Sequence, residues 1–196
     1  MYTAHHSTQL KAATFSGHGS VANIDHMTPW DNWYHCNGNT YGTWLPGDPR
    51  GWRSEDHKIH VDGDYKSPPP PGTDEGLHQH SQNQMQSDAV FLSQHHCCEA
   101  LSIWVSALQH YQLEIAAVAI GSHHWHVLAT FPDHQPRITI GKVKSWCTRQ
   151  LDIPKPIWAA KCRCQPIADP SHWENARGYI LKHVHQGAAV WPSVTR

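Results

Sequence analysis

The sequence predicts an α/β fold of the α+β kind, in which helices pack on one face of an antiparallel sheet. Its length of 196 residues is enough for one domain with a hydrophobic core and without disulfides. Short apolar runs typical of buried strands alternate with longer segments whose apolar residues recur at helical spacing. Two of the short runs lie only a few residues apart, as in an antiparallel hairpin.

The first third of the chain offers little regular structure. Residues 1–29 are polar without an apolar period, so they are predicted to form an extension. A strand is predicted over Trp33–Tyr41, followed by a loop of turn-forming residues to Trp52. Residues from about 53 to 86 are polar, acidic and Pro-rich, and are predicted to be an insertion that holds no core. The domain is therefore expected to span residues 30–191.

Regular structure resumes after this insertion. A helix capped by Ser87 or Asp88 is predicted, because apolar side chains recur there at helical spacing at Val90, Cys97, Leu101, Trp104, Val105, Leu108 and Tyr111. The runs Leu113–Ile120 and His124–Phe131 follow and are predicted to pair as a hairpin.

Three more elements complete the predicted order. Pro136 opens a helix that reaches Leu151, and Trp158–Ile167 is predicted to be a strand. A last helix, capped by Asp169 or Ser171, runs to about His185. Without that last helix, the order β, α, ββ, α, β is the ferredoxin-like split βαβ arrangement, with two helices on one face of the sheet.

Charge is distributed unevenly along the chain. The net charge is −1, but residues 137–182 hold nine basic side chains against three acidic ones, a local charge of +6. Such asymmetry is typical of a phosphate-binding surface, although a solvated helix face has the same composition. The candidate DNA-binding residues are Arg137, Lys142, Lys144, Arg149, Arg177 and Lys182.

Cysteine spacing and hydropathy narrow the class of protein. The six cysteines lack paired C-x-x-C spacing, so a disulfide framework or a zinc ribbon is not indicated. A structural zinc site that uses Cys162 and Cys164 is kept as an alternative. No apolar run approaches the length of a membrane span, and the start of the chain does not have the pattern of a signal peptide. We therefore expect a cytoplasmic protein.

One histidine pair is distinguished by its context. With 19 histidines, His-x-His pairs arise by chance, and the pairs at 78/80 and 183/185 are examples. His124 and His126 lie in an apolar strand, where imidazoles are costly to bury without partners, and their spacing places both on one face. Tyr179 and His183 share a face of the last helix. Together the two faces would offer three imidazoles to one cation beside a phenol, which suits tyrosine attack on a phosphodiester.

These motifs, taken with the loop Tyr41-Gly-Thr-Trp-Leu-Pro-Gly-Asp-Pro-Arg-Gly51, resemble the single-tyrosine HUH transposases, particularly the REP-associated tyrosine transposases. The resemblance covers residues 33–191 apart from the insertion. It implies a metal-dependent endonuclease that cuts and rejoins single-stranded DNA through a 5′-phosphotyrosine. Tyr179 would be the nucleophile, and His124 with His126 would hold Mg²⁺ or Mn²⁺. The implied partner is single-stranded DNA with hairpin ends, and a homodimer is compatible with it; no membrane is involved.

The chain departs from the family at the third metal ligand. The family commonly has Asn or Gln four residues after the tyrosine, where this chain has His183. Three imidazoles favour Mn²⁺, Zn²⁺ or Co²⁺ over Mg²⁺. Gln186 is the alternative ligand, because its distance from Tyr179 also places it on that helix face. A second reading is a domesticated or inactive protein that binds single-stranded DNA or metal without cleavage. Trp44, Trp52 and Trp125 are candidates for base stacking.

Overall fold

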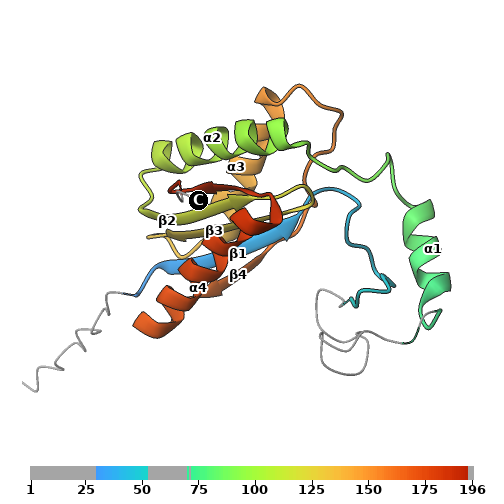
Figure 1. Cartoon of the computed structure of the whole chain (residues 1–196), viewed down its shortest axis with the longest axis horizontal. Helices are drawn as coiled ribbons and strands as arrows, with labels where there is room; N and C mark the ends of the chain where they lie inside the picture. Colours follow the sequence, from blue (N-terminus) through green and yellow to red (C-terminus); the bar gives the residue numbers. More distant parts are fainter. Residues whose placement is uncertain (1–29, 53–69, 71, 194–196) are drawn as a thin grey trace, which may run out of the picture.

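The computed structural model describes residues 30–52, 70 and 72–193 (Figure 1). Within them the chain forms a five-stranded antiparallel sheet and four α-helices, which is a mixed α+β fold. The predicted extension at residues 1–29 and most of the predicted insertion lie outside the described residues. No helix in the described part is both long and apolar enough to cross a bilayer.

The elements follow one another in a simple order. Their bounds are β1 Trp33–Asn39, α1 Glu75–Asn83, α2 Gln94–His110, β2 Ile115–Ile120, β3 His124–Thr130, α3 Pro136–Gln150, β4 Arg163–Pro166, α4 Pro170–Lys182, a 3-10 turn η1 His183–Gln186, and β5 Ala189–Trp191.

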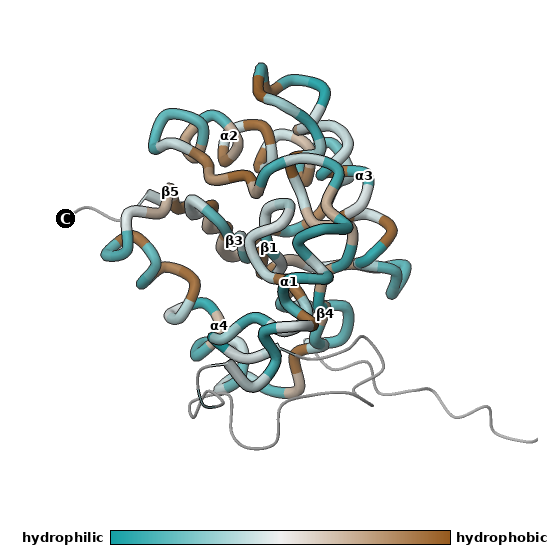
Figure 2. Tube along the Cα trace, turned by 90° about the vertical axis from the view of Figure 1, so that its right-hand side faces the viewer, coloured by the Kyte–Doolittle hydropathy of each residue, from teal (hydrophilic) through white to brown (hydrophobic). Residues whose placement is uncertain are grey.

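The sheet places β3 at its centre. Its strand order is β4-β1-β3-β2-β5, and every neighbouring pair is antiparallel. Helices α2 and α3 cover one face of the sheet, and α4 lies across the other (Figures 1 and 2). Because successive side chains of a strand point to opposite faces, each residue of β3 belongs either to the α2/α3 face or to the α4 face.

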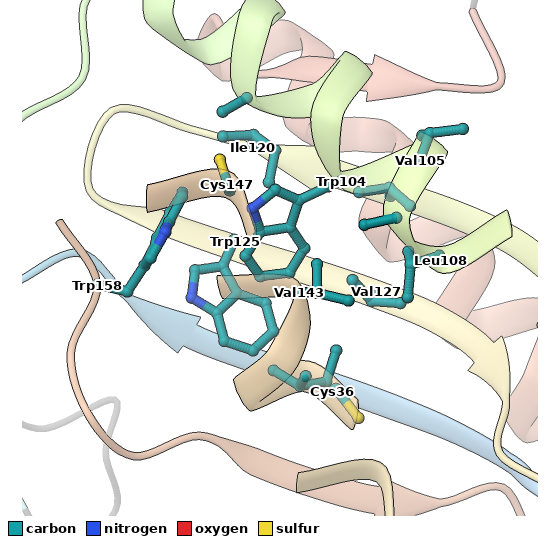
Figure 3. Close-up of a cluster of buried hydrophobic side chains, with 14 of the residues drawn as sticks. Cys36, Trp104, Val105, Leu108, Ile120, Trp125, Val127, Val143, Cys147 and Trp158 are labelled. Carbon is teal, nitrogen blue, oxygen red and sulfur yellow. The ribbon is translucent and has the colours of Figure 1, made fainter. Parts of the chain in front are cut away.

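The main core lies between the sheet and helices α2 and α3. Three tryptophans meet at its centre, where the ring of Trp104 lies 4.8 Å from that of Trp125 and 5.2 Å from that of Trp158 (Figure 3). Trp125 and Val127 of β3 both point into this core and are fully buried. Such large buried rings supply much of the apolar area that stabilises a domain of this size. Trp125 is therefore a core residue with no surface for a nucleobase.

The second core, on the α4 face, is smaller. Ala117 and Ala119 of β2 and Leu128 of β3 pack there against Ala176 and Ile180 of α4. The short alanine side chains on β2 leave room for the helix to approach the sheet. This packing holds one side of α4 against the strands that carry the histidine pair.

The structure moves the start of α2 away from the predicted caps. The helix begins at Gln94, and the Ser93 side chain caps it by accepting a hydrogen bond from the backbone of His96. Residues before it are extended instead, because the N–H of Val90 donates to Tyr41 O (2.9 Å) and the N–H of Leu92 donates to Ser122 O (2.7 Å). These non-local hydrogen bonds outweigh the helical pattern of the segment.

The other differences lie at element ends and edges. Strand β4 is shorter than the predicted Trp158–Ile167, since the earlier part contributes only an isolated bridge between Trp158 and Thr40. Strand β5 was not predicted; it is three residues long and follows a turn at Gly187 with φ of 82°. Helix α1 lies within the predicted insertion, and none of its residues is buried.

Candidate metal centre

The alternation of β3 points His124 and His126 to the face that α4 covers. His126 is 5% exposed and pairs across the sheet with Ala119 of β2 and Asn37 of β1. Helix α4 is capped by Asp169, one of the two predicted caps, whose carboxylate accepts a hydrogen bond from the backbone N–H of His172. Its far end delivers His183 to the same face, where it is 4% exposed.

The structure thus brings the three predicted histidines together. One ring nitrogen from each of His124, His126 and His183 lies within 4.8 Å of the other two. The ring of His183 has its centroid 5.0 Å from that of His124 and 4.6 Å from that of His126. Nitrogens bound to one cation at about 2.1 Å lie about 3–3.5 Å apart, so small side-chain rotations bring these rings into coordination.

The hydrogen bonds around the histidines fit a metal site. Nδ1 of His183 lies 3.0 Å from Tyr179 O and 3.2 Å from Ile180 O. Because carbonyl oxygens only accept, this Nδ1 carries a proton, and the lone pair of the neutral ring is left on Nε2. Nε2 of His124 is buried without a hydrogen-bond partner. A bound cation would satisfy that nitrogen, and carbonyl-oriented imidazoles are typical of metal ligands.

A fourth histidine, His35 of β1, supports His126. Nε2 of His35 lies 3.0 Å from Nδ1 of His126, which leaves Nε2 of His126 to face the other two ligands. His35 was not among the residues predicted from the sequence. The only available signal was its place two residues after Trp33 on a predicted strand, and that signal does not reveal that β1 pairs with β3.

Burial keeps the imidazoles of His35, His124 and His126 neutral at physiological pH. It lowers the pKa of His126 to about 2, with further effects from His183, His35 and His124. Burial, followed by the charges of His123 and His183, lowers the pKa of His124 to about 4. The pKa of His35 falls to about 4 through burial and the nearby charge of Arg163. Neutral imidazole is the form that binds a metal ion.

Tyr179 lies beside this cluster, as the helix spacing predicted. Its ring centroid is 4.8 Å from that of His183 and 5.3 Å from that of His126. The side chain is nevertheless 52% exposed. The next residue, Ile180, is fully buried and anchors the helix. A fixed phenol with an open side can meet both a bound cation and a large substrate.

The alternative ligand Gln186 lies in a different setting from the one predicted. The α-helix ends at Lys182, and Gln186 is an exposed residue of the 3-10 turn that follows. A 3-10 turn has three residues per turn instead of 3.6. The α-helical spacing that placed Gln186 on the face of Tyr179 therefore no longer applies.

The six predicted DNA-binding cations do not form one surface. Arg177 and Lys182 are on α4, on the side of the histidines, whereas the other four are on α3, which packs against the opposite face of the sheet. Lys144 is also 7% exposed, and its ammonium donates to Ala159 O at 2.8 Å. We therefore exclude Lys144 from the proposed DNA contacts.

Arg163 is a cation on the histidine face that was not among the predicted DNA-binding residues. It pairs with Asn37 of β1, which in turn pairs with His126 of β3, so all three side chains point to one face. Arg163 is exposed, and its guanidinium donates to Gln165 Oε1 at 3.0 Å. The sequence shows only that side chains alternate along β4. The face to which Arg163 points depends on the register of β4 with β1 and of β1 with β3.

Cys164 of β4 and Cys162, which directly precedes this strand, form a thiol pair on the opposite face of the sheet. Sγ of Cys162 lies 3.8 Å from Sγ of Cys164. This hydrogen bond and burial raise the pKa of the Cys162 thiol, whereas zinc binds the thiolate. Among the described residues, His124, His126 and His183 are the only close group of three or more His, Cys, Asp or Glu.

Comparisons of the chain with protein-family models, curated proteins and solved structures found no match. The function is therefore inferred from the arrangement of the histidines, the tyrosine and the surrounding charges.

Proposed function

We propose that this protein is a metal-dependent single-stranded DNA endonuclease and transposase of the single-tyrosine HUH type. The observation that carries the proposal is the position of Tyr179, whose ring lies 4.8 Å and 5.3 Å from the rings of two of three clustered histidines. A half-exposed phenol beside a cation site has the parts needed for metal-assisted formation of a phosphotyrosine.

The topology supports the same assignment. The order β4-β1-β3-β2, with α2 and α3 on one face, agrees with the ferredoxin-like split βαβ palm that we propose. The histidine pair lies on its central strand, and the added helix α4 carries the tyrosine on the face opposite α2 and α3. The loop 41–51 that contributed to the resemblance lies directly after β1.

The chemical role of each side chain follows from its place. His124, His126 and His183 would hold Mg²⁺ or Mn²⁺, which withdraws charge from a phosphodiester and stabilises the developing oxyanion. Oη of Tyr179 attacks the phosphorus and forms an O–P bond, while the bond from phosphorus to O3′ breaks. O3′ keeps the electron pair of the broken bond and takes up a proton from solvent, which gives a free hydroxyl. The phenolic proton leaves to solvent through the open side of Tyr179.

Rejoining is the reverse reaction with a different strand. A 3′-hydroxyl attacks the phosphotyrosine, and Tyr179 leaves and recovers a proton. The covalent bond preserves the energy of the broken phosphodiester, which a hydrolase would lose. Arg163, Arg177 and Lys182 are on the same face and would hold the flanking phosphates.

The deciding experiment is formation of a covalent adduct. Incubated with Mn²⁺ or Mg²⁺ and a single strand that carries a hairpin from the DNA flanking its gene, the protein should give a band shift that resists denaturant. Tyr179→Phe should give none, and Tyr111→Phe, at the end of α2 on the other face, should behave as the wild type. An adduct that persists in Tyr179→Phe would show that another group attacks.

The second reading, binding without cleavage, predicts a different result from the same samples. The donor set of three imidazoles is its motivation, because such a set also suits a tightly held Zn²⁺. In that case the wild type would bind the strand and retain metal but yield no adduct with any of the divalent ions.

A further inference from the structure

We infer that a pocket between loop 42–50 and residues 78–91 receives an unpaired base of the DNA strand whose phosphodiester lies at the metal centre. This inference rests on the proposed function and extends it with a site for reading the strand. The pocket measures about 850 Å³, within the range of about 300–1,000 Å³ that is usual for small-molecule sites.

The walls of the pocket are held in close contact. A Cβ on Gly42, whose φ is +71°, would lie only 3.0 Å from the backbone Cα of Ala89. A Cβ on Gly47, whose φ is +83°, would clash with the backbone N of His78 in α1. Both glycines are therefore needed by conformation and by space. The loop that contributed most to the family resemblance thus serves to dock α1 and the 85–91 segment.

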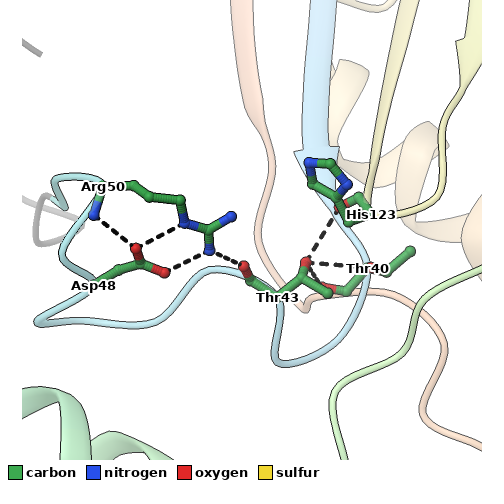
Figure 4. A network of polar contacts seen from close by, with 5 residues as sticks. All are labelled: Thr40, Thr43, Asp48, Arg50 and His123. Atoms are coloured by element: carbon green, nitrogen blue, oxygen red, sulfur yellow. Dashed lines mark hydrogen bonds and ion pairs between the residues drawn. The ribbon is translucent and has the colours of Figure 1, made fainter. Parts of the chain in front are cut away.

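The pocket is also joined to the turn that precedes the metal ligands. The N–H of Thr40 donates to His123 O at 3.0 Å, and Oγ1 of Thr43 donates to the same oxygen at 3.2 Å (Figure 4). The N–H of Leu92 on the other wall donates to Ser122 O at 2.7 Å. Both walls are thereby hydrogen-bonded to Ser122 and His123, the two residues that precede His124.

Aromatic rings connect the pocket to the metal centre. Phe91 lines the pocket and is 66% exposed, the largest exposure among the large apolar residues in the described part of the chain. Its ring lies 6.3 Å from that of His123, which lies 4.6 Å from that of His124. A strand bound at the metal centre can therefore place a neighbouring base on Phe91, where an exposed ring provides a stacking surface.

The charges of the pocket suit a base better than a phosphate. Arg50 is bound to the Asp48 carboxylate and lies 4.5 Å above the Trp44 ring, so its positive charge is already balanced (Figure 4). Asp88 adds a negative charge to the lining, and Oγ of Ser87 is buried there without a hydrogen-bond partner. These oxygens can accept from the amino groups of adenine or cytosine, whereas a phosphate offers no donor.

The test measures binding without cleavage. The probes are a labelled strand of ten deoxyadenosines and the same backbone with abasic residues, titrated by fluorescence anisotropy with chelator present. Phe91→Ala should weaken binding of the first probe about tenfold, within the range for loss of one base–aromatic stack, and leave the abasic probe unchanged. Phe91→Trp should restore binding. Ile138→Ala, which removes an exposed apolar side chain (54%) on α3, is the matched control.

The outcomes separate this inference from the proposed function. Equal binding of the adenine probe by wild type and Phe91→Ala, or no binding by the wild type, would overturn the pocket even if Tyr179 forms its adduct. A loss limited to the base-containing probe would support the pocket even if no adduct forms. As a second measurement, ultraviolet crosslinking to a strand with 5-iododeoxyuridine should modify Phe91 or Trp44. Modification confined to Trp30 and Trp173 would contradict the assignment.

Discussion

Nε2 of His35 and Nδ1 of His126 lie 3.0 Å apart, so a residue of β1 orients a candidate metal ligand of β3. If His126 binds a metal through Nε2, its Nδ1 carries the proton and donates a hydrogen bond to Nε2 of His35. A hydrogen bond of this kind fixes both the ring angle and the tautomer of the ligand. His35 is thus a positioning residue for the metal centre and touches neither the cation nor the phosphodiester.

Removing this support should weaken metal binding. His35→Ala is expected to lower the affinity for Mn²⁺ by about 10- to 100-fold, measured by calorimetry, while saturating Mn²⁺ restores adduct formation. His35→Gln, whose amide oxygen can accept the bond, should recover part of the affinity. His134→Ala changes an exposed histidine bonded to Tyr34 and serves as control. An unchanged affinity in His35→Ala would show that the hydrogen bond has no such role.

His183 and His185 provide a matched test of the third candidate ligand. His183 is 4% exposed and faces the metal centre, whereas His185 is exposed two residues later. His183→Ala should lose more Mn²⁺ affinity than the His35 variant, because a ligand itself is removed, and His183→Gln should retain part of it. His185→Ala should bind as the wild type does. Comparable losses in both alanine variants would contradict the three-histidine site.

The face on which DNA lies can be tested with two arginines. Arg163→Gln, on the histidine face, should weaken single-stranded DNA binding and reduce the salt dependence of log K by about 0.7, the value for one phosphate contact. Arg149→Gln, on α3, removes an exposed charge bonded to Ser145 on the opposite face and should change neither. A larger effect of Arg149→Gln in anisotropy titrations over a salt series would place the strand across α3.

Acidification should destabilise the metal-free protein. Burial holds the pKa of His35 at about 4 and that of His126 at about 2 in the folded state, against about 6.5 when unfolded. Below pH 6.5 the unfolded chain binds protons that the folded site does not. The free energy of unfolding therefore decreases as the pH is lowered. The slope approaches about 1.4 kcal/mol per pH unit for each such histidine. Urea unfolding with chelator should show this fall between pH 7 and 5, and His126→Gln should reduce its slope.

Lys144 is expected to act through stability. Its ammonium donates to the carbonyl oxygens of Ala159, Ala160 and Lys161 at 2.8, 3.4 and 3.2 Å. Lys144→Met would leave these acceptors without that donor, at a cost of about 1–3 kcal/mol in unfolding free energy. Lys142→Met, an exposed neighbour, should change it by about 0.5 kcal/mol or less. Equal midpoints for the two variants in urea would show that this contact does not stabilise the fold.

Part of the site was already determined by local periodicity. Alternation along an apolar strand places His124 and His126 on one face, and a spacing of four places Tyr179 and His183 together on a helix. The cap at Asp169 also follows from its own segment, since it bonds to a backbone N–H three residues away. Each of these features depends on residues close together in the chain, so the sequence alone was enough to predict the shared faces and to narrow the cap to Asp169 or Ser171.

The rest was decided only when the elements packed. Strand register places His35 against His126 and turns Arg163 to the histidine face, whereas packing places the cations of α3 on the opposite side and buries Lys144. Gly42 and Gly47 are explained only by the segments that lie against them, which come from 27 or more residues later in the chain. Periodicity fixes the face of a residue's own helix or strand. Which faces meet depends on non-local hydrogen bonds and core packing, which no single segment of this sequence contains.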